Sequence, residues 1–263
     1  MKVLVKLGGT LLDSADSRQR LAFELAGLRA AGVQLVIVHG GGKQMTRFLA
    51  ERGVESRFVG GLRVSSPEVI DAVLKVLAGT VNHELVASLV AAGALAVGLS
   101  GIDAGLTEAE PMHADLGAVG RPVRSNTALL DLLAGNAYLP VVACVAGDRH
   151  GAVYNVNADQ MAVACASGYG ADRLIFLTDV DGVKGSAGDV LPEITAADCE
   201  KLIADGVATG GMQAKLNAAT DALRNGIGQV IIAPGALHRA AERILAGELI
   251  GTRLAAGGGA FHA

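Results

Sequence analysis

Two short β-branched runs near the start of the chain end in glycine, and the first of them carries a lysine. The run at 3–7 contains Lys6 and passes into a glycine pair at 8–9, and the run at 35–38 passes through a histidine into the glycines at 40–42. A strand that enters a helix through glycine leaves free backbone N–H groups at the helix N-terminus, where the dipole favours an anion. Two such turns, with Lys6 at a strand end where ligand crevices form, favour a cradle for a phosphate chain. Tight packing of strand on helix, without a ligand, is the alternative explanation.

Neither turn matches a common nucleotide-binding template. A Walker A loop requires a glycine five positions before Gly42, where Ile37 stands, and Ser or Thr after Lys43, where Gln44 stands. The dinucleotide fingerprint fails because Met45 occupies the position of its third glycine. The chain is therefore neither a P-loop NTPase nor a conventional dehydrogenase.

Two later segments carry further polar groups in suggestive patterns. Alternation along 153–157 places Asn155 and Asn157 on one face of a strand, and Asp159 follows in the first turn of the next helix. Two amides and a carboxylate so close together suit a site that orients polar groups, although an acid in a first turn also serves to complement the helix dipole. In 210–215 a glycine pair opens a helix that carries Lys215 one turn in. By itself, this lysine equally resembles an exposed helix lysine.

Other candidate groups carry less information. The acidic turn at 178–183 ends a strand and resembles a divalent-ion loop only weakly, so a plain strand exit explains it as well. The histidines show no metal-ligand spacing and no evident nucleophilic partner, so we assign them no catalytic role and expect no metal site formed by side chains. They are His39, His83, His113, His150, His238 and His262.

Composition excludes several classes of protein. With 51% hydrophobic and 18% charged residues, disorder and coiled coil are poor explanations of this 263-residue chain. A net charge of −4 without a basic stretch, and no Trp, argue against nucleic-acid binding. Three scattered cysteines suit a reducing cytosol, and a chain that starts in a strand leaves no signal peptide, so we expect a cytoplasmic protein. The uncharged stretch 85–102 predicts a buried helix, a turn and a core strand rather than a membrane span.

Strand-like and helical segments alternate along the chain, which predicts an α/β fold: a three-layer αβα sandwich around a mainly parallel sheet. A flap or small hairpin is expected at 104–124 and a turn at 147–151. If two lobes exist, the boundary falls near 168–171, giving lobes 1–168 and 169–263. Strands are predicted at 3–7, 35–38, 95–99, 139–145, 173–178 and 229–232, and helices near 17–31, 43–52, 67–92, 126–136, 158–169, 196–204 and 211–226.

Taken in order, these stretches resemble the amino acid kinase family. Each segment is weak evidence alone, but the ordered set is specific and spans nearly the whole chain. The resemblance implies the two-lobed amino acid kinase fold, with an acyl-amino-acid and dimerisation lobe at 1–168 and an ATP lobe at 169–263. The matching segments are 6–9, 39–42, 60–64, 155–160, 179–183 and 211–215, with 251–253 near the end.

The family moves the γ-phosphoryl group of ATP onto a carboxylate, and the resemblance implies roles for particular residues. Lys6 and Lys215 would contact the phosphoryl oxygens from opposite lobes, and Asp159 would hold both lysines in place. The backbone of Gly41 and Gly42, with that of Gly9, would bind the γ-phosphate, while Arg63 and Asn155 would hold the carboxylate and amide of the acyl amino acid. The expected nucleotide-binding residues are Gly8, Gly9, Asp179, Val180, Asp181, Gly182, Val183, Lys184, Gly210, Gly211 and Met212. Mg²⁺ would be held mainly by the nucleotide phosphates, consistent with the lack of a carboxylate cluster.

The form of the motifs favours N-acetyl-L-glutamate as the acceptor. A kinase acting on an aminoadipate or glutamate linked to a carrier protein would want a basic rim, and none is evident. A uridylate or carbamate kinase is disfavoured by the setting of Arg63, and a non-catalytic sensor of nucleotide or amino acid would not need both lysines and Asp159.

Two departures from the family pattern bear on regulation. Arginine-inhibited members carry an extra N-terminal helix that links dimers into a hexamer, whereas this chain begins at the first strand; its end at 247–253 is also short for an arginine site. We therefore expect an arginine-insensitive homodimer, and the apolar length of the 67–92 helix makes that helix a candidate interface. Gly210 stands where many relatives have Asp, which would alter nucleotide contacts without removing the chemistry.

Overall fold

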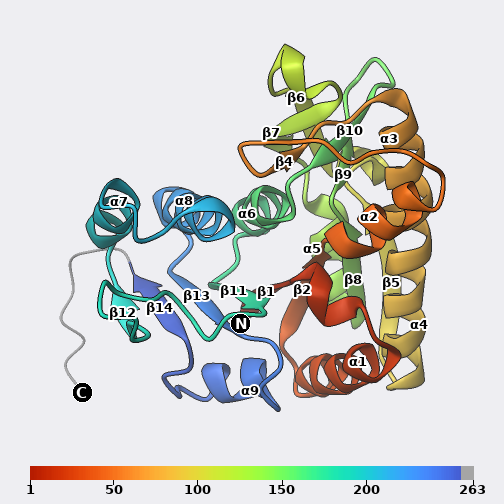
Figure 1. Ribbon diagram of the computed structural model, residues 1–263. Helices are drawn as coiled ribbons and strands as arrows, with labels where there is room; N and C mark the ends of the chain where they lie inside the picture. Colours follow the sequence, from red (N-terminus) through yellow and green to blue (C-terminus); the bar gives the residue numbers. More distant parts are fainter. Residues whose placement is uncertain (256–263) are drawn as a thin grey trace.

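A single eight-stranded sheet runs through the molecule, with helices on both faces (Figure 1). The computed structural model describes residues 1–255, so His262 lies outside the described residues. All neighbouring strands of this sheet are parallel except β13 and β14. In spatial order they are β12 (Glu193–Ile194), β14 (Thr252–Ala255), β13 (Gln229–Pro234), β11 (Arg173–Thr178), β1 (Lys2–Leu7), β2 (Gln34–His39), β8 (Tyr138–Ala143) and β5 (Leu95–Ser100).

The helices form the two outer layers of the predicted sandwich. In Figure 1, α6 and α8 lie on one face of the sheet and α1 and α9 on the other. A π-helical segment, Leu74–Val81, joins α3 to α4 and makes one long helix of the three. The helices are α1 (Ala15–Ala30), α2 (Gly42–Ala50), α3 (Pro67–Val73), α4 (Asn82–Ala91), α5 (Ala128–Gly135), α6 (Ala158–Tyr169), α7 (Ala196–Ala204), α8 (Gly210–Arg224) and α9 (Ala240–Leu245), with short 3₁₀ turns at Gly9–Leu12, Asp103–Gly105 and Ala114–Leu116.

Two smaller β structures stand at the carboxyl-terminal edge of the sheet. Four strands close into a small barrel: β6 (Thr107–Pro111), β7 (Val119–Ser125), β9 (Val145–Gly147) and β10 (Val153–Val156). The hairpin of β3 (Phe58–Val59) and β4 (Leu62–Arg63) turns through Gly60 and Gly61, whose φ angles of +56° and +80° suit the tight turn. The flap expected at 104–124 is thus the β6–β7 hairpin, and the expected turn at 147–151 joins β9 to β10.

The core is aliphatic, as the composition requires. The inner strands β1, β2, β11 and β13 are mostly apolar and buried on both faces because helices cover both sides. The predicted strands and helices are all present, with ends shifted by a few residues. Sequence reasoning missed α9, β3, β4, β12 and β14, which are short and carry little periodic signal. The boundary predicted at 168–171 falls between α6 and β11, yet β11 pairs with β1, so one sheet serves both predicted lobes.

One helix of the described chain is long and apolar enough to cross a membrane by length and composition, namely Pro67–Ala91. A core helix passes the same test, and here Leu85 and Leu89 are fully buried beside β5. The uncharged stretch 85–102 forms the end of α4, a turn and β5, as predicted.

Candidate active site

The two glycine turns lie side by side at the carboxyl ends of β1 and β2. These strands are parallel neighbours with Leu7 opposite His39, so the turns that follow leave the same edge of the sheet. A Cβ atom on Gly9 would come within 3.1 Å of the backbone nitrogens of Gly41 and Gly42, so glycine permits this close approach. The structure therefore joins both turns into one cradle.

The backbone N–H groups of the cradle differ in availability. The N–H of Gly8 donates to the carbonyl of Leu177 at 2.9 Å, which continues the ladder between β1 and β11. The expected contact of Gly8 with nucleotide therefore cannot use that N–H group. Within residues 1–255 the N–H of Gly41 donates no hydrogen bond, and Gly42 lies in the first turn of α2, where N–H groups have no intrahelical partner.

Three charged side chains from three elements meet beside this cradle. The Nζ atom of Lys6 lies 2.7 Å from Oδ1 of Asp159, and the Nζ atom of Lys215 lies 2.9 Å from Oδ2 of the same carboxylate. Each of the three side chains is only about one-tenth exposed: 9% for Lys6, 9% for Asp159 and 10% for Lys215. The sequence singled out these residues separately, and the structure brings them into one cluster, hereafter the Lys–Asp–Lys cluster.

Local structure places each member of the cluster. Lys6 lies on β1, and Asp159 stands in the first turn of α6, where the N-cap Asn157 accepts hydrogen bonds from the N–H groups of Asp159 and Gln160. Lys215 lies in the second turn of α8, which packs against α6. The sequence predicted Asp159 in the first turn of this helix, and the N-cap at Asn157 confirms that position.

The cluster keeps one uncompensated positive charge. Burial raises the pKa of Asp159, but the charges of Lys6 and Lys215 outweigh burial and leave that pKa below its usual value. Burial likewise lowers the pKa of Lys215, and the carboxylate of Asp159 opposes this effect. An ionised carboxylate between two lysinium groups gives a net charge of +1, which suits a site for an anion.

Arg63 is buried between the β3–β4 hairpin and the second glycine turn. Its Nη2 atom donates to the carbonyl of Gly42 at 3.1 Å and to Oγ1 of Thr46 at 2.7 Å, while Nη1 donates to the hydroxyl of Ser56. The guanidinium also stacks 4.6 Å from the ring centroid of Phe58. These contacts hold the guanidinium rigidly against the cradle.

Asn155, the other predicted contact to the acceptor, reaches the same corner from β10. Its Nδ2 atom donates to Oγ of Ser65 at 3.0 Å, and that hydroxyl donates to the carbonyl of Arg63 at 2.9 Å. The structure thus brings Arg63 and Asn155 together through Ser65, although 92 positions separate them in the chain.

The expected nucleotide segments lie at the end of β11 and the start of α8. The charge of Asp179 partly opposes the lowering of the pKa of Lys215 by burial. The beginning of the acidic turn therefore lies near the Lys–Asp–Lys cluster. The side chain of Val183, in contrast, is fully buried, and its N–H donates to Oγ1 of Thr252 at 2.8 Å. Gly210 has a φ of +53°, a conformation that favours glycine over residues with a Cβ atom.

The remaining residues expected to bind nucleotide differ in how exposed they are. Most residues of the acidic turn are exposed. At the start of α8, Gly210 and Gly211 are exposed and Met212 is half-buried. In the acidic turn, Val180 and Asp181 are exposed, Gly182 is buried, and Lys184 pairs with Val190 in an isolated β-bridge.

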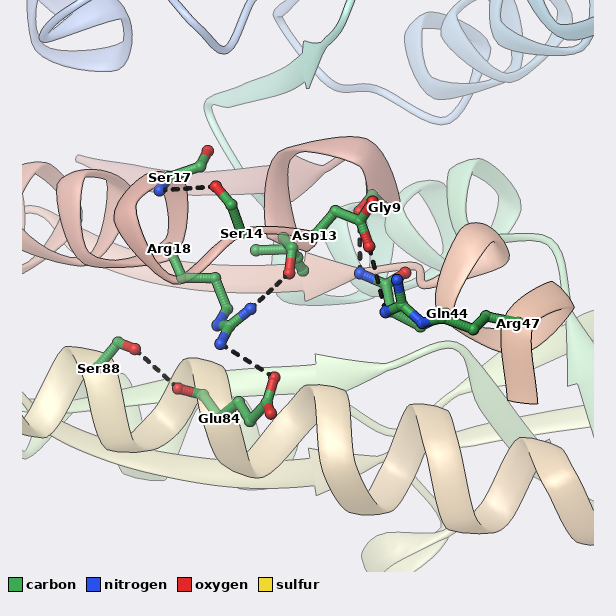
Figure 2. A network of polar contacts seen from close by, with 10 residues as sticks. Gly9, Asp13, Ser14, Ser17, Arg18, Gln44, Arg47, Glu84 and Ser88 are labelled. Atoms are coloured by element: carbon green, nitrogen blue, oxygen red, sulfur yellow. Dashed lines mark hydrogen bonds and ion pairs between the residues drawn. The ribbon is translucent and has the colours of Figure 1, made fainter. Parts of the chain in front are cut away.

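Polar side chains that sequence reasoning passed over brace the cradle. Figure 2 shows Gln44 of α2 reaching the first glycine turn, where its Nε2 atom donates to the carbonyl of Gly9 at 3.3 Å. The same view shows Arg47, whose Nη2 atom lies 3.4 Å from Oδ1 of Asp13. The spacing of Gln44 and Arg47, three positions apart on one helix, signals a shared face, but only the fold shows what that face meets.

The braces continue on the other side of the first turn. Arg18 of α1 donates to the carbonyl of Leu12 at 2.9 Å and pairs with Glu84 of α4 at 3.2 Å (Figure 2). The turn that carries Gly9 is therefore tied to α1 and α2, and α1 is in turn tied to α4.

Comparison with known proteins agrees with this geometry. The model of the amino acid kinase family matches residues 1–234. An acetylglutamate kinase of Solibacter usitatus (strain Ellin6076) is 68% identical over 254 residues, which cover 97% of this chain and 99% of that protein. An acetylglutamate kinase of Rhizobium rhizogenes (strain K84 / ATCC BAA-868) is 41% identical over 246 residues, covering 89% of this chain and 83% of that protein. Among solved structures, smu.665 from Streptococcus mutans UA159 aligns with a TM-score of 0.83 at 29% identity, covering 97% of this chain and 98% of that one.

Proposed function

The chain belongs to the amino acid kinase family, and from this premise we propose that it transfers the γ-phosphoryl group of ATP to the side-chain carboxylate of N-acetyl-L-glutamate. The products are ADP and N-acetylglutamyl 5-phosphate, an acyl phosphate that serves arginine biosynthesis. The observation that carries the phosphoryl-transfer chemistry is the buried Lys–Asp–Lys cluster beside two joined glycine turns. The acceptor is inferred from the relatives that are named acetylglutamate kinase.

The reaction needs alignment and charge neutralisation more than covalent help. An oxygen of the ionised acceptor carboxylate attacks the γ-phosphorus, a new P–O bond forms, and the bond to the β,γ-bridging oxygen breaks, leaving its electron pair on ADP. The acceptor is already an anion at neutral pH, so no general base is required. Lys6 and Lys215 stabilise the charge on the moving phosphoryl group and its bridging oxygen. Asp159 contacts both lysines and acts by holding them in position.

The nucleotide is expected to span the junction of the two predicted lobes. Backbone N–H groups of Gly9, Gly41 and Gly42 bind the γ-phosphate, and the segments 179–184 and 210–212 hold the remainder of ATP. Within the described residues, no group of three or more His, Cys, Asp or Glu side chains could hold a metal ion. This donor set fits a Mg²⁺ ion that arrives on the nucleotide phosphates, where it neutralises their charge.

The acceptor is held by the corner formed by Arg63 and Asn155. A guanidinium supplies parallel donors that match a carboxylate, and Arg63 is prevented from turning away by Thr46, Ser56 and Phe58. The amide of Asn155 is the partner for the acetamido group. Of the alternatives drawn from the sequence, neither the carrier-protein substrate nor a non-catalytic sensor is favoured, since the relatives that match almost the whole chain are named acetylglutamate kinase.

A cytoplasmic homodimer is the assembly that we propose. Strand β5 is an edge strand of the main sheet, and apolar side chains are exposed on it and along the long helix: Leu74 at 40%, Val90 at 54% and Leu95 at 58%. Pairing of two such edges would cover these side chains. The three cysteines are free and buried, which suits a reducing compartment. Light scattering on the purified protein tests the mass of the assembly.

The function is tested by trapping the acyl phosphate. Purified protein with ATP, Mg²⁺ and N-acetyl-L-glutamate should give the hydroxamate when hydroxylamine is present, with one ADP formed per hydroxamate. L-Glutamate, N-acetyl-L-aspartate and L-α-aminoadipate are matched acceptors that separate carboxylate length from acetylation. Activity on another acid alongside silence with N-acetyl-L-glutamate would refute the proposed acceptor.

A further inference from the structure

His39 is completely buried directly before the second glycine turn, although nothing in the phosphoryl-transfer chemistry uses it. It is the last residue of β2, and its Nδ1 atom lies 2.9 Å from the carbonyl oxygen of Gly40. On the other side of the ring, its Nε2 atom lies 3.0 Å from Nδ2 of Asn82 in α4. Both ring nitrogens are therefore engaged, one by the turn and one by the long helix.

The contacts of Asn82 decide which ring nitrogen carries the proton. Its Nδ2 atom is also 3.0 Å from the carbonyl oxygen of Val141, an acceptor only, so Nδ2 is correctly the amide nitrogen and not the oxygen. Nδ2 also has a longer contact of 3.5 Å to the carbonyl of Leu99, but its two acceptors at 3.0 Å are Val141 and Nε2 of His39, so the two hydrogens of the amide are directed at these. Nε2 must accept, so the hydrogen of the ring lies on Nδ1 and is donated to Gly40. Burial lowers the pKa of His39 to about 4, so the ring is neutral at physiological pH.

A hydrogen bond to the carbonyl of Gly40 also orients the next N–H group. The carbonyl of Gly40 and the N–H of Gly41 belong to one planar peptide unit and point in opposite directions. When Nδ1–H of His39 holds the carbonyl on the core side, the N–H of Gly41 points away from the core. That N–H donates no hydrogen bond within residues 1–255, and it lies beside Gly9.

On the basis of the proposed phosphotransferase function, we infer that His39 is a positioning residue: its Nδ1–H tautomer, selected by Asn82, aims the N–H of Gly41 at the transferred phosphoryl group. His39 does not touch the substrate. It acts through the Gly40–Gly41 peptide, which a glycine-rich turn would otherwise leave free to rotate. A preorganised donor of this kind stabilises charge that develops in the transition state without reorganising during the reaction.

Neighbouring residues restrict both the Gly41 turn and the side chain of Asn82. A Cβ atom on Gly41 would lie 2.5 Å from Cδ2 of Leu77, so the π-helical segment packs directly against the turn. A Cβ atom on Gly98 of β5 would overlap Oδ1 of Asn82, so only glycine leaves room for the amide in its present orientation. The long helix thereby contacts the cradle at two neighbouring points, Leu77 and Asn82.

Three substitutions at the same position separate positioning from packing. His39→Asn keeps an amide donor at the place of Nδ1, His39→Gln keeps a polar atom at the place of Nε2, and His39→Leu keeps neither. We expect kcat in the hydroxamate assay to stay within about threefold of wild type for His39→Asn and to fall about 10- to 100-fold for His39→Gln and His39→Leu, with little change in the KM for ATP. Equal losses for His39→Asn and His39→Gln would overturn the inference, because a packing role would not distinguish them.

Two NMR measurements test the inference without turnover. In ¹⁵N-histidine-labelled protein, His39 should show a pyrrole-type nitrogen at Nδ1 and a pyridine-type nitrogen at Nε2, unchanged from pH 8 to about pH 5.5; the opposite tautomer would refute the proposed orientation. The amide resonance of Gly41 should shift on addition of the ATP analogue AMP-PNP with Mg²⁺ in wild type and His39→Asn, but little in His39→Gln. An equal shift in all three proteins would refute the role of His39. If wild type forms no hydroxamate, the proposed function fails while these two measurements still decide the inference.

Discussion

Replacing Asp159 by Asn would test the electrostatic balance of the Lys–Asp–Lys cluster. The amide has the shape of the carboxylate but no charge, so Lys6 and Lys215 would keep their burial and lose the carboxylate that lies 2.7 and 2.9 Å from them. Removing one partner of a buried ion pair typically costs about 3–5 kcal/mol. Deprotonation of a lysine limits this cost, so we expect the free energy of unfolding to fall by about 3 kcal/mol at neutral pH.

The pH dependence of this loss has a definite sign. Burial already lowers the pKa of Lys215, and the loss of Asp159 would lower it further. Between that lowered value and the ordinary lysine pKa of about 10.4, the unfolded variant binds more protons than the folded variant, so its stability rises with pH. The deficit of Asp159→Asn relative to wild type should therefore shrink between neutral pH and about pH 9.5.

Urea unfolding of the ligand-free proteins at both pH values measures these differences. Asp131→Asn is the matched control, because its carboxylate also pairs with a lysine, Lys2, at 2.8 Å, but on the surface, where the side chains are 35% and 47% exposed. An exposed ion pair contributes only about 0–1 kcal/mol to the free energy of unfolding. The deficit of Asp131→Asn should therefore be small and should not shrink between neutral pH and about pH 9.5. A deficit below about 1 kcal/mol for Asp159→Asn, or one equal at both pH values, would refute the argument.

Five further substitutions, one of them studied as a function of pH, probe the site and the fold. Lys215→Ala should lower kcat by about 10²-fold or more, as expected for one preorganised charge contact; in steady-state kinetics, a change confined to KM would limit Lys215 to binding. Arg63→Lys should raise the KM for N-acetyl-L-glutamate about tenfold, since a lysine cannot reproduce the bidentate and stacked contacts, and an unchanged KM would remove Arg63 from the acceptor site. The free energy of unfolding of wild type, relative to that of His39→Asn, should decrease by about 3 kcal/mol as the pH falls from 6.5 to about 4. The reason is that the histidine binds a proton in the unfolded state but stays neutral when buried in the folded state. A stability difference that does not change with pH in urea-unfolding experiments would contradict this. Gly27 lies in the interior of α1 with open space around a new Cβ, so Gly27→Ala should raise the free energy of unfolding by about 0.5–1 kcal/mol. Gly98→Ala should lower it, because the new Cβ would overlap Asn82. Thermal melts that showed the opposite order of stability would contradict this.

Local chemistry accounts for the parts of the molecule that were predictable. The strands at 3–7 and 35–38 are largely apolar runs followed by glycine turns, and such runs are typical of buried strands in a parallel sheet. Asn157 caps α6, as its type and position indicate, which places Asp159 in the first turn. In contrast, β12 and β14 are short strands at the edge of the sheet, and α9 is a helix of six residues, so none has enough length for a periodic signal.

The sequence by itself determined the alternation of strands and helices, the two glycine turns and the polar residues that resemble those of the amino acid kinases, because these depend on neighbours within a few positions. Only the tertiary structure decided which distant groups meet. Lys6, Asp159 and Lys215 meet because α6 and α8 pack together over β1 and its neighbours. The role of His39 is the clearest case: its own neighbours mark it as a strand end, and the packing of α4 supplies the amide that selects its tautomer. Burial turns such meetings into strong interactions, because a polar group removed from water depends on its few protein partners.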